Sequence, residues 1–411
     1  MRPTELWHEP DFLKLWGGQA VSRLGSAITD GALPLTAILM LNASPFELGL
    51  LSGAGAASIL IFGLFAGAWA DRLRRRPILI GTDLGRALIL GMVPITAAFG
   101  HLRMSYLYMI SAASSLLTVL FEVSYQAYLP SLVERENLME GNSKLALAGS
   151  AADVAGPGLM GVLVQWFTAP KAILLDAVSF LVSALSVALI RKPEATPKLD
   201  RQPEMKREIV DGLRASWQQP ILRALVLRTG TSAVFLGFFA ALYMVFAIRE
   251  LHLSPALLGA IISVGGASSL AGAFVTPWLV KRFGVGPTLI GAAIVTGITT
   301  LMPALSRGPV IVCASILGLA QLFDVSWPVY HINKVSLQQA VTPDHLLGRV
   351  NSAIYLLFRG LIPVGALLGG ALGDAIGMRP TMFVGASGYL LSALFLIFSP
   401  IRHLRELPEA R

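Results

Sequence analysis

The sequence predicts an all-α membrane protein, with twelve transmembrane helices arranged as two pseudo-symmetric six-helix bundles. The chain of 411 residues has a mean hydropathy of +0.68, and only 14% of its residues are charged, whereas soluble chains carry roughly a quarter. Apolar stretches of about 20 residues recur from end to end, each long enough to cross the hydrocarbon core. The chain also repeats itself: residues 44–81 align without gaps with residues 254–291, and 13 of the 38 positions are identical.

Each apolar stretch is expected to be a helix, because an open backbone cannot satisfy its hydrogen bonds in lipid. The first stretch contains Arg23 and Asp30 and is too long and too polar to be a cleaved signal peptide. The twelve predicted spans are residues 12–41, 46–70, 77–98, 104–128, 145–168, 170–190, 221–248, 257–280, 287–305, 309–331, 348–375 and 379–399.

The basic residues predict the orientation of these spans. Most of the 32 lysines and arginines fall in alternate loops, at the helix ends beside those loops or in the two tails, which are therefore expected to be cytoplasmic. The five residues at the opposite loops are Arg103, Lys171, Arg249, Arg307 and Arg379. The net charge of +8 fits a cytoplasmic face beside anionic lipid, so we expect membrane lipid and no nucleic acid as partner. The predicted location is a bacterial inner (plasma) membrane.

One polar segment, residues 191–219, divides six spans from six. It begins as a proline-containing linker, and then Met205, Ile209 and Leu213 recur at fourfold spacing, which predicts an amphipathic helix on the inner leaflet. The expected organisation is an N-terminal bundle (1–190), this cytoplasmic linker (191–219), a C-terminal bundle (220–400) and a basic cytoplasmic tail (401–411).

A glycine followed by Asp-Arg and a run of arginines ends the second span. This loop resembles a signature of the major facilitator superfamily, although Arg74 stands where the family usually has glycine. A merely basic inner loop would explain the arginines but not an aspartate after the glycine. The resemblance implies a latch that holds one face closed and opens when the halves rock, formed by Gly67, Asp71, Arg72, Arg75 and Arg76. The second copy, 281–284, lacks the aspartate.

The fifth span resembles the glycine-proline motif of the superfamily's antiporters. Its residues are Gly149, Gly156, Pro157 and Gly161. Glycines allow neighbouring helices to approach, and proline permits a bend. Packing alone is the alternative explanation, since both residues are common in membrane helices. Of all features in the chain, this motif best favours export over uptake.

Further segments spread over the whole chain are similar to one exporter branch of the superfamily, which includes actinobacterial efflux permeases and enterobactin-type and macrolide-type exporters. They include residues 125–133, 155–158, 348–352 and 363–370. The resemblance implies a monomeric secondary transporter that exports small amphipathic molecules, such as antibiotics or siderophore-like compounds, in exchange for protons. Repeated halves with the substrate path between them are typical of such transporters. Uptake or facilitated diffusion of a nutrient, and a non-transporting sensor or lipid-handling protein, are the alternatives.

Charged residues inside the spans are the candidates for proton coupling. Gln19, Arg23, Ser26 and Asp30 share one face of the first helix. A carboxylate shielded from water can bind a proton on one side and release it on the other, and a nearby arginine can be its exchangeable partner. The candidates are Asp30, Arg23, Glu122 and Asp153; for Asp30 the alternative is a permanent salt bridge with Arg23. The arginine frequent in the family's fourth helix is missing, which makes Arg23 its substitute.

Other ionisable residues have structural explanations. Asp83 and Arg86, one turn apart, are expected to pair. Glu122 and its repeat counterpart Asp324 are predicted near inner helix ends, where Glu122 would close a cytoplasmic gate with Arg72, Arg75 or Arg349. Asp176 is predicted to lie near the outer surface.

The predicted substrate cavity combines polar residues of the first half with aromatic residues of the seventh span. The candidates are Gln19, Ser115, Phe235, Phe239, Tyr243 and Arg359. Aromatic walls tolerate bulky amphipathic molecules, and packing is the alternative role for each ring. Arg359 would either attract an anionic substrate or neutralise Glu122.

No enzyme signature is present in the sequence. There is no Walker sequence, nucleophile elbow or helix-borne histidine pair, so neither ATP nor a resident metal or cofactor is expected, and a proton gradient is the predicted energy source. The single cysteine, Cys313, excludes a disulfide and a cysteine-built metal site and is expected to pack in the tenth span.

Overall fold

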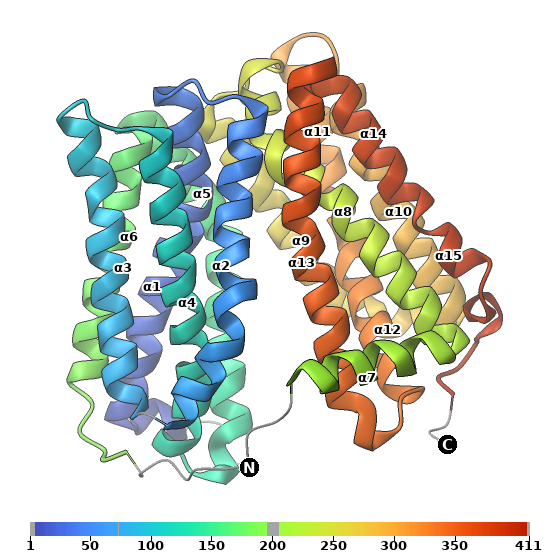
Figure 1. Ribbon diagram of the computed structural model, residues 1–411, viewed down its shortest axis with the longest axis horizontal. Coiled ribbons are helices and arrows are strands. Elements are labelled where there is room, and N and C mark those ends of the chain that lie inside the picture. Colours follow the sequence, from blue (N-terminus) through green and yellow to red (C-terminus); the bar gives the residue numbers. More distant parts are fainter. Residues whose placement is uncertain (1–4, 73, 195–204, 409–411) are drawn as a thin grey trace. The chain divides into compact units, whose positions relative to one another are not determined.

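The computed structural model describes residues 5–72, 74–194 and 205–408 of the chain; the side chains of Glu5, Arg135, His345 and residues 59–72 and 205–211 lie outside that description. Every regular element in the described residues is a helix (Figure 1), so the all-α prediction is confirmed. The elements of the first half are η1 (Glu5–His8), α1 (Pro10–Met40), α2 (Pro45–Arg72), α3 (Arg75–Ala98), α4 (Met104–Leu132), η2 (Arg135–Asn137), α5 (Leu138–Trp166) and α6 (Ala169–Ala188).

The second half repeats this order after a short linking helix. Its elements are α7 (Met205–Gln218), α8 (Pro220–Arg249), α9 (Pro255–Phe283), α10 (Val285–Leu305), α11 (Val310–Leu322), η3 (Phe323–Val325), α12 (Ser326–Ala340), α13 (Asp344–Ile376), α14 (Met378–Leu391), α15 (Leu394–Ile397) and η4 (Pro400–His403). Ten helical segments of the described residues are long and apolar enough to cross a membrane. The two remaining predicted spans, 12–41 and 46–70, fall on α1 and α2, which are helices of 31 and 28 residues.

The chain folds into two compact units. Unit 1 contains residues 1–43, 54–202 and 254–263, and unit 2 contains residues 44–53, 203–253 and 264–411. The first turns of α2 therefore belong to unit 2, and those of α9 belong to unit 1. The predicted linker 191–219 is divided in the same way, because Arg191–Glu194 belong to unit 1 and α7 belongs to unit 2.

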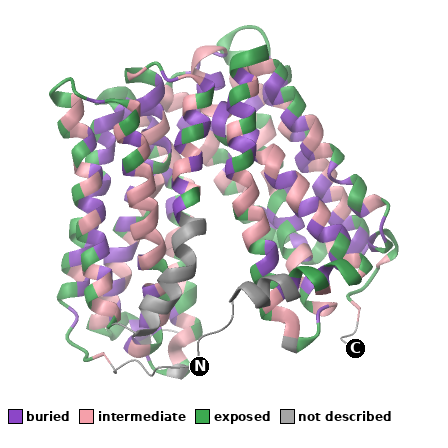
Figure 2. Cartoon of the chain, viewed as in Figure 1, coloured by how far each residue is buried: buried purple, intermediate pink, exposed green. Residues whose placement is uncertain are grey.

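Unit 1 is built on close contacts between α1 and α6 and between α3 and both α4 and α6. Glycines on α1 make its contact with α6 possible. A Cβ at Gly18 would lie 2.8 Å from Cβ of Ser186, and one at Gly25 would lie 2.5 Å from a carboxylate oxygen of Asp176. The polar groups of α6 are thereby enclosed in the bundle. Bands of buried, intermediate and exposed residues alternate along the helices (Figure 2).

Unit 2 is built around α8, which packs against α13 and α14. Two glycines bring α8 and α13 together, since a Cβ at Gly237 would lie 2.2 Å from the carbonyl oxygen of Ile362 and one at Gly365 would lie 1.8 Å from that of Val234. Neither position accommodates a larger residue without moving a helix. The linking helix α7 packs closely on α13 at Gly212. A Cβ at this glycine would lie 2.3 Å from the carbonyl oxygen of Arg349. The helix α7 covers the residues where the sequence predicts one, and its amphipathic character and place at the membrane surface stay predictions.

The tenth predicted span differs from its counterpart in unit 1. The helix α4 is continuous, whereas the corresponding chain is divided into α11, η3 and α12, with Asp324 in the short central element. This span, Val310–Ala340, also extends well past the predicted end at residue 331. Ser326 lies directly after η3 and its hydroxyl donates to the carbonyl of Phe323, which helps to satisfy backbone that has left the regular helical pattern.

The N-termini of α3 and α10 are capped at equivalent positions by the chain that follows the last helix of each half. In unit 1, the Glu194 carboxylate accepts from the backbone nitrogens of Arg75 at 2.8 Å and Arg76 at 3.2 Å. In unit 2, the backbone nitrogens of Val285 and Gly286 donate to the carbonyls of Arg405 at 3.2 Å and Leu404 at 2.8 Å. The free N–H groups at the start of a helix are satisfied in both cases, by a side chain in one and by backbone in the other.

Candidate functional site

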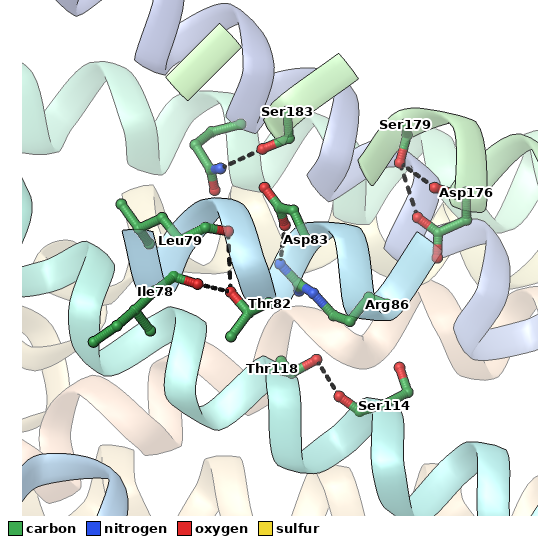
Figure 3. A network of polar contacts seen from close by, with 11 residues as sticks. Ile78, Leu79, Thr82, Asp83, Arg86, Ser114, Thr118, Asp176, Ser179 and Ser183 are labelled. Atoms are coloured by element: carbon green, nitrogen blue, oxygen red, sulfur yellow. Dashed lines mark hydrogen bonds and ion pairs between the residues drawn. The ribbon is translucent and has the colours of Figure 1, made fainter. Parts of the chain in front are cut away.

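A buried ion pair lies at the centre of unit 1. Arg86 and Asp83, both on α3, are 4% and 0% exposed, and the Arg86 guanidinium donates to the Asp83 carboxylate (Figure 3). The predicted pairing of these two residues is confirmed. The guanidinium also stacks on two rings, with its carbon 4.4 Å from the centroid of Phe121 on α4 and 4.0 Å from that of Phe180 on α6. The arginine therefore holds three helices together.

Polar residues of α6 surround this pair. Ser183 lies beside Asp83 (Figure 3), and its hydroxyl accepts a hydrogen bond of 3.1 Å from the side-chain amide of Gln19 on α1. Gln19 is 4% exposed, so in this structure the predicted cavity residue lies inside the bundle. Asp176 is 1% exposed and accepts from Ser179 at 2.9 Å. The prediction that Asp176 lies near the outer end of its span stays a prediction, while its side chain is enclosed because Gly25 lets α6 press its polar face onto α1.

Four other charged residues of unit 1 have exposed side chains although they lie deep in their helices. These are Arg23 and Asp30 on α1, Glu122 on α4 and Asp153 on α5. Asp30 is ten residues from the end of α1, which corresponds to about 15 Å along the axis. The Asp30 and Asp153 carboxylates repel each other electrostatically across the contact between α1 and α5. All four candidates for proton coupling thus face accessible space.

Arg23 contacts Glu122. The sequence instead predicts that Arg23 pairs with Asp30 and that Glu122 pairs with an arginine at a cytoplasmic gate. The Nη1 atom of Arg23 is 3.9 Å from Oε1 of Glu122, and each side chain is about half exposed. Glu122 lies ten residues from the end of α4, not at a gate near its end, because the helix continues to Leu132. Arg75, one of the predicted gate partners, instead contacts Glu194 at 3.9 Å. Arg23 therefore bridges α1 to α4 and not to its own neighbour Asp30.

The predicted latch is only partly within the described side chains. Gly67, Asp71 and Arg72 lie in the helical stretch 59–72, whose side chains are outside the description. Arg75 and Arg76 are described: their backbone nitrogens bind Glu194, and Nη2 of Arg76 donates to the carbonyl of Ala188 at 2.6 Å. The two arginines thus fix the start of α3 to the end of α6.

The glycine-proline motif of α5 makes close contacts at two of its glycines. A Cβ at Gly156 would lie 2.4 Å from Cβ of Ala27, and one at Gly161 would lie 2.3 Å from the carbonyl oxygen of Pro255 in the first turn of α9. Likewise, a Cβ at Gly259 would lie 2.2 Å from the carbonyl oxygen of Pro157. Gly149 has open space where a Cβ would be, so it does not mediate packing here.

Unit 2 contains a buried arginine that the sequence analysis did not identify. Arg228 on α8 is 4% exposed, and its guanidinium carbon lies 3.8 Å from the ring centroid of Tyr330 and 5.2 Å from that of Tyr389. Its Nη2 atom donates to the Tyr389 hydroxyl at 3.4 Å. The signal was present, since an arginine inside a predicted span is rare and significant.

The predicted aromatic wall is divided between packing and accessible positions. The Phe235 ring packs at a tilt beside that of Phe238, with centroids 5.6 Å apart, and covers Gly388, so it packs inside unit 2. Phe239 is half-buried, and Tyr243, also half-buried, accepts a long hydrogen bond of 3.5 Å from Gln321. Two cavity candidates remain. Ser115 is half-buried, with its hydroxyl 3.0 Å from the Cβ position of Gly55, and the exposed Arg359 lies 5.7 Å from the ring centroid of Tyr355.

Charge is distributed unequally between the two units. We counted the ionisable Asp, Glu, Lys and Arg residues that lie at least seven residues from the ends of their helix or span. In the described helices of unit 1 these are five acids and two arginines: Asp30, Asp83, Glu122, Asp153, Asp176, Arg23 and Arg86. In the described helices of unit 2 they are one acid and two arginines: Asp324, Arg228 and Arg359. No group of three or more His, Cys, Asp or Glu side chains in the described part could hold a metal ion.

This architecture agrees with known membrane transporters. Residues 15–364 match the Major Facilitator Superfamily, and the chain belongs to this superfamily; it is a multi-pass transporter and not an enzyme. It is 27% identical to the multidrug efflux pump Tap of Mycolicibacterium fortuitum, covering 94% of each chain. It is 25% identical to macrolide efflux protein A of Streptococcus pyogenes, covering 96% of this chain and 97% of that protein.

Solved structures show the same fold at lower identity. A bacterial homologue of the iron transporter ferroportin, in its inward-facing state, matches with a TM-score of 0.77 and 18% identity, covering 94% of this chain and 98% of that one. The nucleoside transporter NupG matches with a TM-score of 0.73 and 11% identity, covering 97% of this chain and 98% of that one. The family match confirms the predicted superfamily, and the solved structures confirm its helical fold.

Proposed function

We propose that this protein exports small amphipathic molecules from the cell in exchange for protons. The observation that carries the proposal is the excess of acids in unit 1, where five deep carboxylates are matched by two arginines. Unpaired carboxylates at this depth are costly unless they bind a proton or another cation. The relation to multidrug and macrolide efflux proteins over nearly the whole chain supports export as the direction.

Asp30 is the proposed proton carrier, with Asp153 as its companion. Both side chains are exposed, so protons can reach them. A site of this kind holds a proton while it is open to the acidic side and exchanges it for a cationic or polar substrate group on the other. Asp83 is excluded from this role, since Arg86 occupies its carboxylate inside the bundle.

Transport into everted membrane vesicles tests this function. A radiolabelled macrolide and a fluorescent amphipathic cation are the probes, chosen because the relatives include multidrug and macrolide efflux proteins. We expect both probes to accumulate when the vesicle interior is acidified and to leave when the gradient is collapsed. Equilibration without accumulation would replace the proposal by facilitated diffusion, and no gradient-dependent movement of either probe would reject export of this substrate class.

Exchanging the charges of Arg23 and Glu122 is expected to separate a functional ion pair from a structural one. The pair is half exposed, and such pairs contribute about 0–1 kcal/mol to stability, so R23E should leave the amount of folded protein unchanged. It should nevertheless slow transport severalfold, because two acids would then face each other between α1 and α4. The double variant R23E/E122R should recover transport. Equal rates in the single variant and the wild type would remove the pair from the mechanism.

Replacing Asp71 by Asn is expected to impair transport while the protein stays folded and inserted. The proposed latch acts between conformations, so its loss should weaken the switch between them and not the packing of the helices. Initial transport rates at matched protein levels check this, with the wild type as the reference. Normal transport by D71N would show that the signature is not used as a latch in this chain.

A further inference from the structure

A groove of about 660 Å³ lies at the N-terminal end of α3 in unit 1. Arg74 and Arg76 line it together with Pro193 from the segment after α6. Ile80 and Gly81 continue the lining one turn further along α3. Arg74 is exposed, and a Cβ at Gly81 would meet nothing within 4 Å, so the groove is open over this glycine.

The charge of the groove is positive although Glu194 also lines it. The Glu194 side chain is 5% exposed, and its two oxygens accept from the backbone nitrogens of Arg75 and Arg76, with the Arg75 guanidinium 3.9 Å away. That carboxylate is therefore already neutralised by its own neighbours. The Arg76 guanidinium is anchored to the carbonyl of Ala188 at 2.6 Å, which fixes a cation beside the open end.

The groove leads directly onto an exposed apolar face of α3. Large apolar side chains follow Gly81 at intervals of three or four residues, and we call this set the α3 stripe: Leu84 (48% exposed), Leu88 (71%), Met92 (49%), Ile95 (57%) and Phe99 (73%). Gly81 to Phe99 spans about 27 Å along a helix, close to the roughly 30 Å of a hydrocarbon core. This length fits a stripe that faces lipid chains, with Arg74 and Arg76 at headgroup depth.

We propose that this groove binds an anionic phospholipid, with its phosphate between Arg74 and Arg76 and one acyl chain over Gly81 along the α3 stripe. The two arginines match a phosphate in charge and in hydrogen-bond geometry. The glycine leaves room for the first methylenes of the chain, and a large side chain such as leucine would occupy that room. A free phosphate would use the arginines but would gain nothing from the open glycine or the stripe.

Native mass spectrometry of the purified full chain tests this with phosphatidylglycerol, phosphatidylcholine and glycerol 3-phosphate as probes. We expect phosphatidylglycerol to bind at least tenfold more tightly than phosphatidylcholine. R74Q/R76Q should weaken its binding about 30-fold, since each basic residue near an anionic lipid contributes roughly a factor of five. G81L should also weaken it severalfold while leaving both charges in place.

Two matched variants control for nonspecific effects. R103Q removes an exposed arginine at the other end of the bundle, and G91L adds the same side chain as G81L at another open glycine of α3; both should bind phosphatidylglycerol as the wild type does. Equal binding by R74Q/R76Q, or equal affinity for phosphatidylcholine, would overturn the proposal. Competition by glycerol 3-phosphate at lipid-like concentrations, together with unchanged binding by G81L, would identify a site for a soluble anion and would likewise overturn it.

Discussion

Replacing Asp30 by Asn is expected to abolish accumulation of substrate driven by a proton gradient. The side chain keeps its size but can no longer exchange a proton, so it imitates a permanently protonated carboxyl group. Substrate should still bind and exchange down its own gradient, because the accessible face that carries Asp30 is otherwise intact. The measurement is the ratio of accumulated to external probe in everted vesicles at matched protein levels, and this ratio should fall to about one.

Asp153→Asn is the informative companion to this variant. Asp30 keeps its carboxylate in this variant, so proton-driven accumulation by D153N should persist. Asp83→Asn is unsuitable as a control because it disturbs the buried pair. Wild-type accumulation by D30N would transfer the proton role to Asp153 or Glu122, and loss of folded protein in D30N would instead indicate a structural role.

Replacing Asp83 by Ala is expected to destabilise unit 1 by about 3–5 kcal/mol, because it leaves the Arg86 guanidinium buried without its carboxylate. The measurement is thermal unfolding of the purified protein, detected as loss of the monodisperse fraction with rising temperature. Glu122→Gln is the matched control: it also removes an acid from an arginine, but at a half-exposed site where the effect should stay under about 1 kcal/mol.

The double variant D83L/R86M distinguishes charge from packing. Apolar residues of similar volume often replace a buried ion pair without loss of stability, so this variant should recover much of what D83A loses. The Phe121 and Phe180 rings, which now stack on the guanidinium, would then pack on a thioether chain. Stability of D83A equal to wild type would show that Arg86 finds another partner or water.

The helices could be predicted from the sequence because hydropathy acts locally. A run of apolar residues in lipid must satisfy its own backbone, so every predicted span corresponds to helix. The pairing of Asp83 with Arg86 could also be predicted, because it too depends on local sequence: residues three apart on a helix are neighbours. The division of the tenth span at Asp324 was missed, because it depends on a few backbone groups and not on composition.

Partners on different helices could not be predicted in this way. Periodicity places Arg23 and Asp30 on one helix face, but it does not say which neighbouring helix faces them, and the structure brings Arg23 to Glu122. Gln19 and Asp176 point into the bundle because glycines on α1 let α6 approach closely, an effect that depends on two helices at once. The burial of Arg228 between Tyr330 and Tyr389 likewise joins residues from three helices.

The two helix caps at equivalent positions of the halves differ in how they can be altered by mutation. Glu194 caps α3 through its side chain, so a single missense change removes both of its bonds. Leu404 and Arg405 cap α10 through backbone carbonyls, which every amino acid possesses. The second cap is therefore insensitive to most substitutions but is lost when a stop codon or a deletion shortens the chain before residue 404. Engineered fusions to this end of the protein should accordingly keep residues 400–405 intact and join beyond them.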